Sequence, residues 1–115
     1  MIKRSGSSEI LHDVVEHKGV LSLAGVVAED LSQGMAGQAR QVFEEIDRQL
    51  VAHGSDRNHL LSALIFITDM KLKPEMNKAW QAWLKKEHLP TRATIGINDL
   101  GPKVLIEVVV TAAVK

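Results

Sequence analysis

Two side chains near the C-terminus have the types and spacing needed to hold and hydrolyse a small acid. Glu107 stands alone in the apolar run Val104–Val110, where an unpaired buried carboxylate costs several kcal/mol. Arg92 lies fifteen positions earlier, and its planar guanidinium can bind a carboxylate through two parallel hydrogen bonds. If the turn Asp99–Leu100 closes a hairpin, Arg92 and Glu107 lie opposite one another and share a face. The pair is then either a structural salt bridge or part of a site for a carboxylic acid.

The sequence has no pattern typical of disulfides, metal sites, phosphate-binding loops or polyanion binding. There is no cysteine, which excludes disulfides, thiolate metal sites and a cysteine nucleophile. The five histidines show no metal-ligand spacing, and Gly34 and Gly37 do not follow a strand as they would in a phosphate-binding loop. Fourteen basic residues balance fourteen acidic ones, so no general field attracts nucleic acid or an anionic membrane. We therefore expect no metal, no cofactor, and no nucleic-acid or membrane partner.

The order of elements follows from the spacing of apolar residues, which alternates in strands and recurs every three or four positions in helices. Gly54 marks the end of the first helix, because glycine readily takes the left-handed conformation found there. Pro74 suits the first turn of the second helix. The pattern predicts the order β-β-α-β-α-β-β in a single domain, residues 1–115. The segments are two short strands within Leu11–Ala28 joined at Lys18-Gly19, a helix over Gly34–His53, a strand over Leu60–Thr68, a helix over Pro74–Lys86, and a C-terminal hairpin of Thr91–Ile97 and Lys103–Val114.

One face of the predicted sheet needs a partner. Each helix has a single apolar stripe, so the two helices cover one face, whereas the strands Leu60–Thr68 and Val104–Val114 are apolar toward both faces. We expect a symmetric homo-oligomer that packs these faces together. The alternative is a monomer in which the N-terminal segment covers the second face. The sequence has no apolar run of membrane length, which together with the lack of cysteine favours a cytoplasmic protein.

Four motifs at matching separations, in this order of elements, resemble the Rid family, the YjgF-like family of reactive intermediate deaminases. The likeness covers the chain from about Leu11 onward. The motifs are Pro90-Thr91-Arg92 followed by Leu100 and Lys103-Val104-Leu105-Ile106-Glu107, Met76-Asn77-Lys78-Ala79-Trp80 on the second helix, Gln38-Ala39-Arg40 on the first helix, and Gly25 after the second strand.

The resemblance implies a chorismate-mutase-like α+β fold and a homotrimer with three clefts between neighbouring subunits. In this family the residue that matches Arg92 holds the substrate carboxylate, and the residue that matches Glu107 lies near the attacking water. Asn77 matches an asparagine that lines the cleft. The implied reaction is the hydrolysis of 2-enamines or 2-imines, such as 2-aminoacrylate, to 2-keto acids and ammonia, without a cofactor.

Three positions differ from the best-studied branch of the family. Leu11 aligns near the cleft tyrosine, Ala24 replaces the serine before Gly25, and Thr94 stands in place of the cysteine that follows the arginine. We expect these differences to change the substrate range more than the basic chemistry. An imine carbon is already electrophilic, so the protein mainly has to orient the carboxylate and place a water molecule.

Two other classes of function remain compatible with part of this pattern. A non-catalytic binder or sensor of small 2-keto or amino acids would use Arg92 equally well. A nucleic-acid or protein-interaction module is the third class, and the zero net charge and the lack of a basic stripe argue against it. Turnover of a 2-imino acid separates the enzyme from the binder.

Overall fold

The computed structural model describes residues 1–115 and contains seven strands and two α-helices. The strands are β1 Lys3–Ser7, β2 His12–His17, β3 Val20–Leu23, β4 Val26–Val27, β5 Leu60–Ile67, β6 Thr91–Gly96 and β7 Ile106–Ala113. The helices are α1 Met35–Ala52 and α2 Lys73–Trp83, and short 3-10 turns lie at Arg57–His59, Met70–Leu72 and Lys86–His88.

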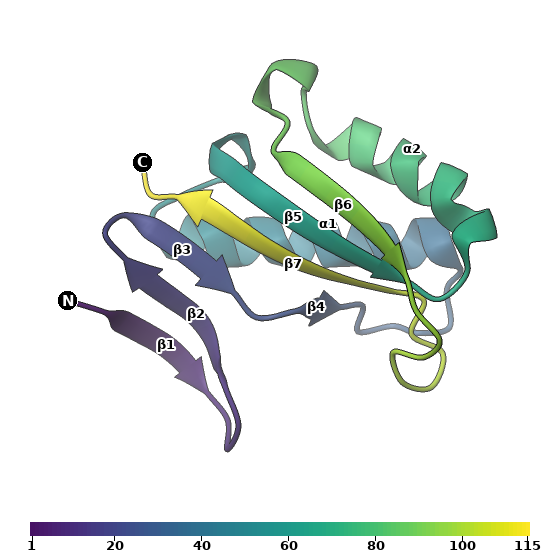
Figure 1. Cartoon of the computed structure of the whole chain (residues 1–115), viewed down its shortest axis with the longest axis horizontal. Coiled ribbons are helices and arrows are strands. Elements are labelled where there is room, and N and C mark those ends of the chain that lie inside the picture. Colours follow the sequence, from purple (N-terminus) through teal and green to yellow (C-terminus); the bar gives the residue numbers. More distant parts are fainter.

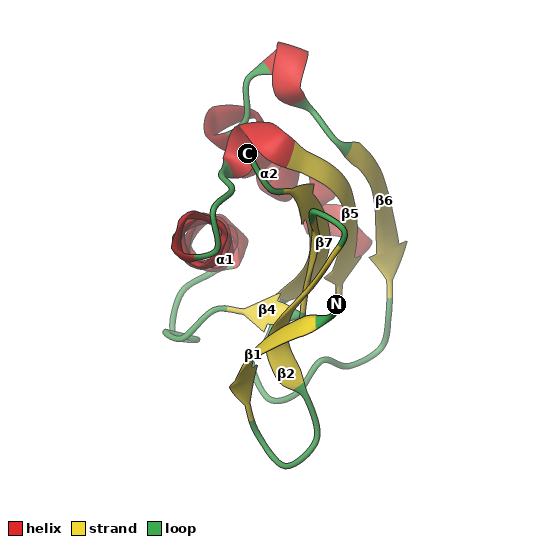
Figure 2. Ribbon diagram, turned by 90° about the vertical axis from the view of Figure 1, so that its left-hand side faces the viewer, coloured by secondary structure: helices red, strands yellow, loops and turns green.

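All seven strands belong to one sheet, in the order β1-β2-β3-β7-β5-β6, with the short β4 paired to β7 as well (Figure 1). β5 and β6 run parallel, and every other pair is antiparallel. Both helices lie on the same side of the curved sheet and leave its other side bare (Figure 2). The prediction of a mixed α+β fold with two helices on one face is confirmed.

The predicted C-terminal hairpin is wrong, because β6 and β7 are not neighbours. β5 lies between them: Ala63 of β5 is paired with Arg92, and Phe66 of β5 is paired with Glu107. The turn near Asp99 does form, since the Gly101 amide donates to the Asp99 side chain at 2.8 Å, but it belongs to a longer loop across the end of β5. β5 is apolar toward both faces, and such a strand is best placed in the middle of a sheet.

Both helices are confirmed, with one boundary shifted. α1 ends at Ala52 and Gly54 follows with a φ of +83°, the left-handed conformation that glycine adopts at low cost. α2 stops at Trp83, three residues before the predicted end, because Leu84 is already extended with φ −114° and ψ 139°. The later 3-10 turn Lys86–His88 then leads into β6. Neither α-helix is long and apolar enough to cross a membrane.

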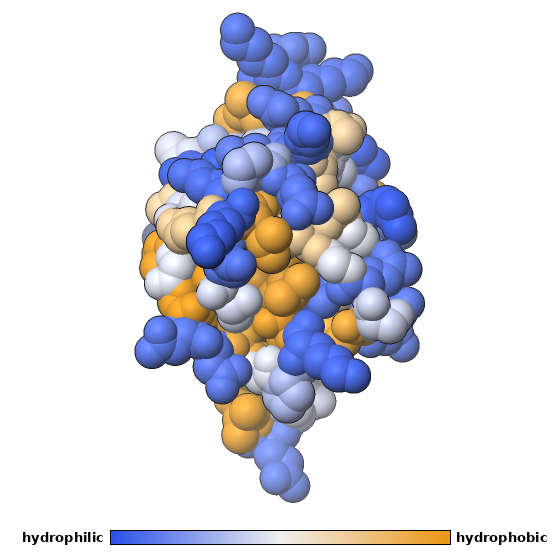
Figure 3. Space-filling view, turned by 90° about the vertical axis from the view of Figure 1, so that its right-hand side faces the viewer, coloured by the Kyte–Doolittle hydropathy of each residue, from blue (hydrophilic) through white to orange (hydrophobic).

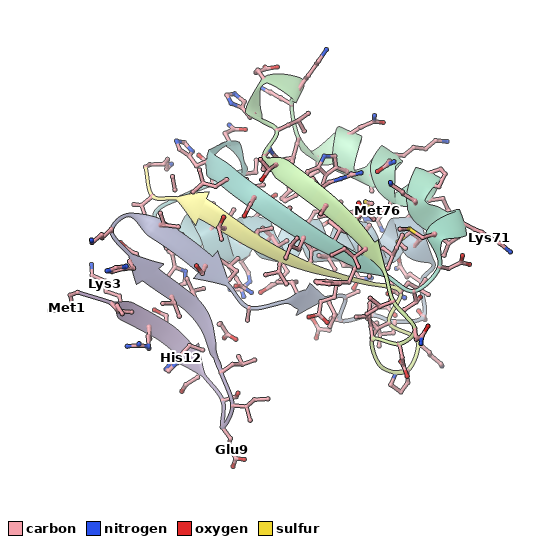
Figure 4. All side chains as sticks on the ribbon, in the orientation of Figure 1. Met1, Lys3, Glu9, His12, Lys71 and Met76 are labelled. Atoms are coloured by element: carbon pink, nitrogen blue, oxygen red, sulfur yellow. The ribbon has the colours of Figure 1, made fainter.

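The N-terminal residues form a strand that the polar sequence of Lys3–Ser7 did not indicate. β1 pairs with β2 at one edge of the sheet, and the hairpin extends away from the body of the molecule, with Glu9 near its tip (Figure 4). An edge strand exposed on both sides needs no apolar pattern, so the alternation of apolar residues that predicts a strand is absent here. This segment therefore extends the sheet and does not cover its bare face.

The two faces of the sheet differ sharply in burial. Along β7 the residues Ile106, Val108 and Val110 are almost fully buried against the helices. Trp80 and Trp83 of α2 complete this core by packing on the ring of Phe43, which stacks on that of Trp83 at 4.5 Å. The bare face keeps apolar side chains that are 37 to 43% exposed, namely Val20, Val27, Leu64 and Ile95.

The end of the molecule that carries the β6–β7 loop also shows apolar atoms, gathered at its centre and enclosed by hydrophilic residues (Figure 3). Met70, at this end of β6, is 47% exposed and lies against Gly96. Exposed apolar surface of this kind is typical of an interaction site.

Candidate functional site

The candidate residues from the sequence fall into two separate groups in the folded chain. The first group lies where the start of β6 faces α2, and the second lies where β4 pairs with β7. Leu11, in the connection between β1 and β2, is 44% exposed and belongs to neither group. The first group is Asn77, Arg92 and Thr94, and the second is Ala24, Gly25 and Glu107.

Arg92 is a partly buried cation without an acidic partner. Its side chain is on the helix side of β6, where the guanidinium carbon lies 5.2 Å from the centre of the Trp80 ring. Its Nη1 atom is 4.0 Å from the sulfur of Met76, a buried residue that α2 directs toward the strands (Figure 4). Every salt bridge in the chain involves other residues. Burial lowers the pKa of Arg92 from its ordinary value, so the site lacks a counter-ion that an anionic ligand would supply.

Two buried oxygen atoms in the same region have no hydrogen-bond partner. They are Asn77 Oδ1 on α2 and Thr94 Oγ1, which is two residues beyond Arg92 on the same side of β6. Buried polar atoms are almost always paired in folded proteins, because an unpaired one costs about 1–3 kcal/mol. Asn77 Oδ1 can only accept and therefore lacks a donor, whereas the Thr94 hydroxyl can either donate or accept.

Arg92 and Asn77 border a pocket of about 580 Å³, which we call the β6–α2 pocket. Its size is in the range of small-molecule sites. A cation beside an unpaired acceptor is complementary to a ligand that carries a carboxylate and an N–H group. The residues that line it are Asn77, Trp80, Gln81, Leu84, Lys86, Leu89, Pro90 and Arg92.

A second pocket, of about 700 Å³, lies between β4 and α1 and also contains an arginine. That arginine, Arg48, is already occupied, since its Nε atom donates to Glu45 at 2.8 Å. Glu29 and Glu44 also line this pocket and make it acidic. It is therefore a poorer place for an organic anion than the β6–α2 pocket.

Glu107 lies on the bare face of the sheet, in close contact with Gly25. It is partly buried and directly paired with Phe66 of β5 and with Val27 of β4. A methyl group added to Gly25 would overlap the Glu107 carboxylate and come within 3.1 Å of its Cγ atom. The glycine is thus needed for space, and Ala24 beside it is fixed by a 2.9 Å hydrogen bond from its amide to the Asp13 carbonyl.

The predicted contact between Arg92 and Glu107 is wrong within one chain. Their side chains point to opposite faces of the sheet, and β5 lies between their strands. A structural salt bridge between the two residues of one chain is wrong as well, because neither residue makes a salt bridge there. A cleft that contains both side chains therefore needs two copies of the chain.

Gln38 is a positioning residue that the sequence analysis names only as part of the motif Gln38-Ala39-Arg40, without a role. It is completely buried on α1, where its Nε2 atom donates to the Lys103 carbonyl at 3.0 Å. Its Oε1 atom accepts from the Leu105 amide at 2.9 Å. The side chain thus holds the start of β7, two residues before Glu107. The signal was a long amide among the apolar positions of an amphipathic helix.

The chain nowhere gathers three histidine or acidic side chains in an arrangement able to hold a metal ion.

Comparison with known proteins places the whole chain among relatives. Residues 3–114 match the family model described as endoribonuclease L-PSP. The RutC family protein YoaB of Escherichia coli is 36% identical over 102 residues, 89% of each chain. A crystal structure of NMB1025, a member of the YjgF protein family from Neisseria meningitidis, superposes with a TM-score of 0.95 at 32% identity and covers 100% of this chain and 96% of that one. An uncharacterised Pseudomonas aeruginosa protein gives the same TM-score at 30% identity, with all of both chains covered.

Proposed function

We propose, from the premise that the chain belongs to the YjgF/RutC family of Rid-like proteins, that it hydrolyses reactive 2-enamines and 2-imines to 2-keto acids and ammonia. The observation that carries the proposal is that the partly buried, unpaired guanidinium of Arg92 lines the same pocket as Asn77, whose buried Oδ1 lacks a donor. A 2-imino acid offers a carboxylate to the first and an N–H group to the second. A 2-keto acid offers only the carboxylate.

The reaction requires little covalent chemistry from the protein. A 2-enamine first gains a proton on carbon to become the imine, and water then adds to the imine carbon while the nitrogen takes up a proton. The resulting tetrahedral carbon expels ammonia as its remaining hydroxyl becomes the carbonyl. The protein can contribute in two ways. Arg92 can orient the carboxylate of the substrate, and a carboxylate of the protein can orient the attacking water.

Glu107 is our candidate for the group that orients this water and accepts its proton. Because Arg92 and Glu107 of one chain face opposite ways, we assign the two to different subunits that meet at a cleft. The bare apolar face supports a symmetric oligomer, for which we propose a homotrimer. Sedimentation should then give about three times the chain mass of 12.6 kDa, and a monomer at micromolar concentration would contradict it.

A non-catalytic binder of 2-keto or amino acids is the second candidate. The observation in its favour is that the β6–α2 pocket of one chain has a site for a carboxylate without a carboxylate base beside it. The balanced net charge favours neither candidate but gives no support to a nucleic-acid substrate.

The test is turnover of freshly generated 2-iminopropionate, followed as ammonia release above the spontaneous rate. The enzyme should accelerate hydrolysis, and Glu107→Gln should abolish the acceleration while keeping the affinity for 2-oxobutyrate. If the wild type binds 2-oxobutyrate but does not accelerate imine hydrolysis, the protein is a non-catalytic binder and the proposal of an enzyme is wrong. Unchanged turnover in Glu107→Gln would remove Glu107 from the mechanism.

A further inference from the structure

The β6–α2 pocket contains two cations and no acid. Arg92 and Lys86 both line it, and none of the remaining lining residues is acidic. This local excess is unusual for the chain, in which fourteen Lys and Arg balance fourteen Asp and Glu. Lys86, like Arg92, makes no salt bridge. The pocket as a whole thus favours a ligand with more than one negative charge.

The two cations come from different elements of the pocket wall. Arg92 is on β6 and stands over the ring of Trp80, whereas Lys86 belongs to the 3-10 turn after α2. Leu84 and Leu89 line the pocket as well. A ligand that spans this arrangement has an anionic group at one end, a short carbon chain and a second anionic group at the other.

The volume of the pocket fits such a ligand better than the smallest imines. At about 580 Å³ it has more space than a three-carbon acid fills, and Lys86 forms no salt bridge that would compete for a ligand. A second carboxylate on the ligand would occupy this space and pair with Lys86. An exposed ion pair contributes little, so we expect the gain in affinity to be a few-fold.

We infer that the pocket selects 2-imino acids whose side chain carries a second carboxylate, with Arg92 on the 1-carboxylate and Lys86 on the side-chain carboxylate. This inference rests on the proposed function for its reaction, although the binding part can be tested alone. Lys86 is then a specificity-determining residue and takes no part in the chemical step.

The experiment compares imines generated in situ from glutamate with imines generated from 2-aminobutyrate. Lys86→Gln is compared with Lys85→Gln, a neighbouring exposed lysine that does not line the pocket. The wild type should hydrolyse the dicarboxylic imine with the higher kcat/KM. Lys86→Gln should lower kcat/KM for it by about three- to tenfold and have a smaller effect on the other imine, whereas Lys85→Gln should match the wild type.

A wild type without preference for the dicarboxylic imine, or equal effects of the two lysine substitutions, would overturn the inference. A calorimetric measurement with 2-oxoglutarate and 2-oxobutyrate separates it from the proposed function. Tighter, Lys86-dependent binding of 2-oxoglutarate without turnover of any imine would support the dicarboxylate pocket and refute the enzyme. Turnover of both imines with no effect of Lys86 on binding would support the enzyme and refute the pocket.

Discussion

Arg92 and Glu107, the two residues to which we assign the chemistry, point to opposite faces of one sheet and are separated by the width of β5. Arg92 faces the helices and contacts Trp80, whereas Glu107 faces the bare side and contacts Gly25. One chain therefore carries two half-sites. In the homotrimer that we propose, the apolar surface on the bare side holds neighbouring copies together, so that Arg92 of one copy meets Glu107 of another.

Replacement of Arg92 tests its role as the carboxylate anchor. Arg92→Lys keeps the charge but loses the two-pronged geometry, so we expect imine hydrolysis to fall by about ten- to a hundredfold. Arg92→Ala should lower it further. Because no carboxylate of the same chain pairs with Arg92, the Ala variant leaves no unpaired acid there. Its melting temperature should therefore stay close to that of the wild type, and sedimentation should find the oligomer intact. A dissociated Ala variant beside a fully active Lys variant would mean that Arg92 is structural.

Gly25→Ala tests whether the position of Glu107 matters for turnover. The added methyl group overlaps the carboxylate, and Glu107 can avoid it by rotating its flexible side chain, so stability should change little. We expect kcat to fall by about tenfold with little change in KM. Gly34→Ala is the control, because a methyl group there meets nothing within 4 Å. Equal kinetics of the two variants would show that Glu107 need not be held in its present place.

Gln38→Leu tests the attachment of β7 to α1. The substitution keeps the volume but leaves the Lys103 carbonyl and the Leu105 amide without their partner. We expect the free energy of unfolding in urea to fall by about 2–5 kcal/mol. Gln41→Leu is the control: Gln41 bonds to the exposed backbone of Asp30, so its loss should cost less than about 1 kcal/mol. Similar losses in both variants would deny Gln38 a special role.

Asp47 predicts a pH dependence of stability. Burial raises its pKa from the ordinary 3.8, although the Trp83 indole and Arg57 oppose the rise. The folded state thus binds a proton more readily than the unfolded chain, and the stability that this contributes is lost as pH rises through the raised pKa. Asp47→Asn, which can still accept from Trp83, should therefore gain stability relative to the wild type as the pH rises above about 4, until the pH passes the raised pKa of Asp47. A difference that stays constant with pH would contradict this.

The local elements were predictable from sequence because their causes are local. Each helix is defined by its own apolar stripe, which includes Phe43 on α1 and Trp80 on α2, and the end of α1 is marked by Gly54. None of these signals depends on residues far away in the sequence. Strand order is different. Whether Glu107 pairs with Arg92 or with Phe66 depends on which strand lies in the centre of the sheet. That place goes to β5, whose side chains are apolar toward both faces.

The candidate site was predictable in its membership but not in its arrangement. The motif residues Asn77 and Arg92 do meet at one pocket, and Gly25 does meet Glu107. The unpaired oxygens of Asn77 and Thr94, and the second cation Lys86, became visible only with the packing of α2 on β6. No spacing rule in the sequence relates residues that a helix and a strand bring together in this way.

The most direct test of the central claim is to mix two inactive variants, Arg92→Ala and Glu107→Gln, and allow their subunits to exchange. If Arg92 and Glu107 of different subunits form each cleft, a one-to-one mixture restores about one cleft in four to the intact pair. We predict a recovery of about a quarter of wild-type turnover in the exchanged mixture as a whole, once mass spectrometry shows that oligomers with both variants have formed. Mixed oligomers no more active than either parent would contradict a cleft shared between subunits.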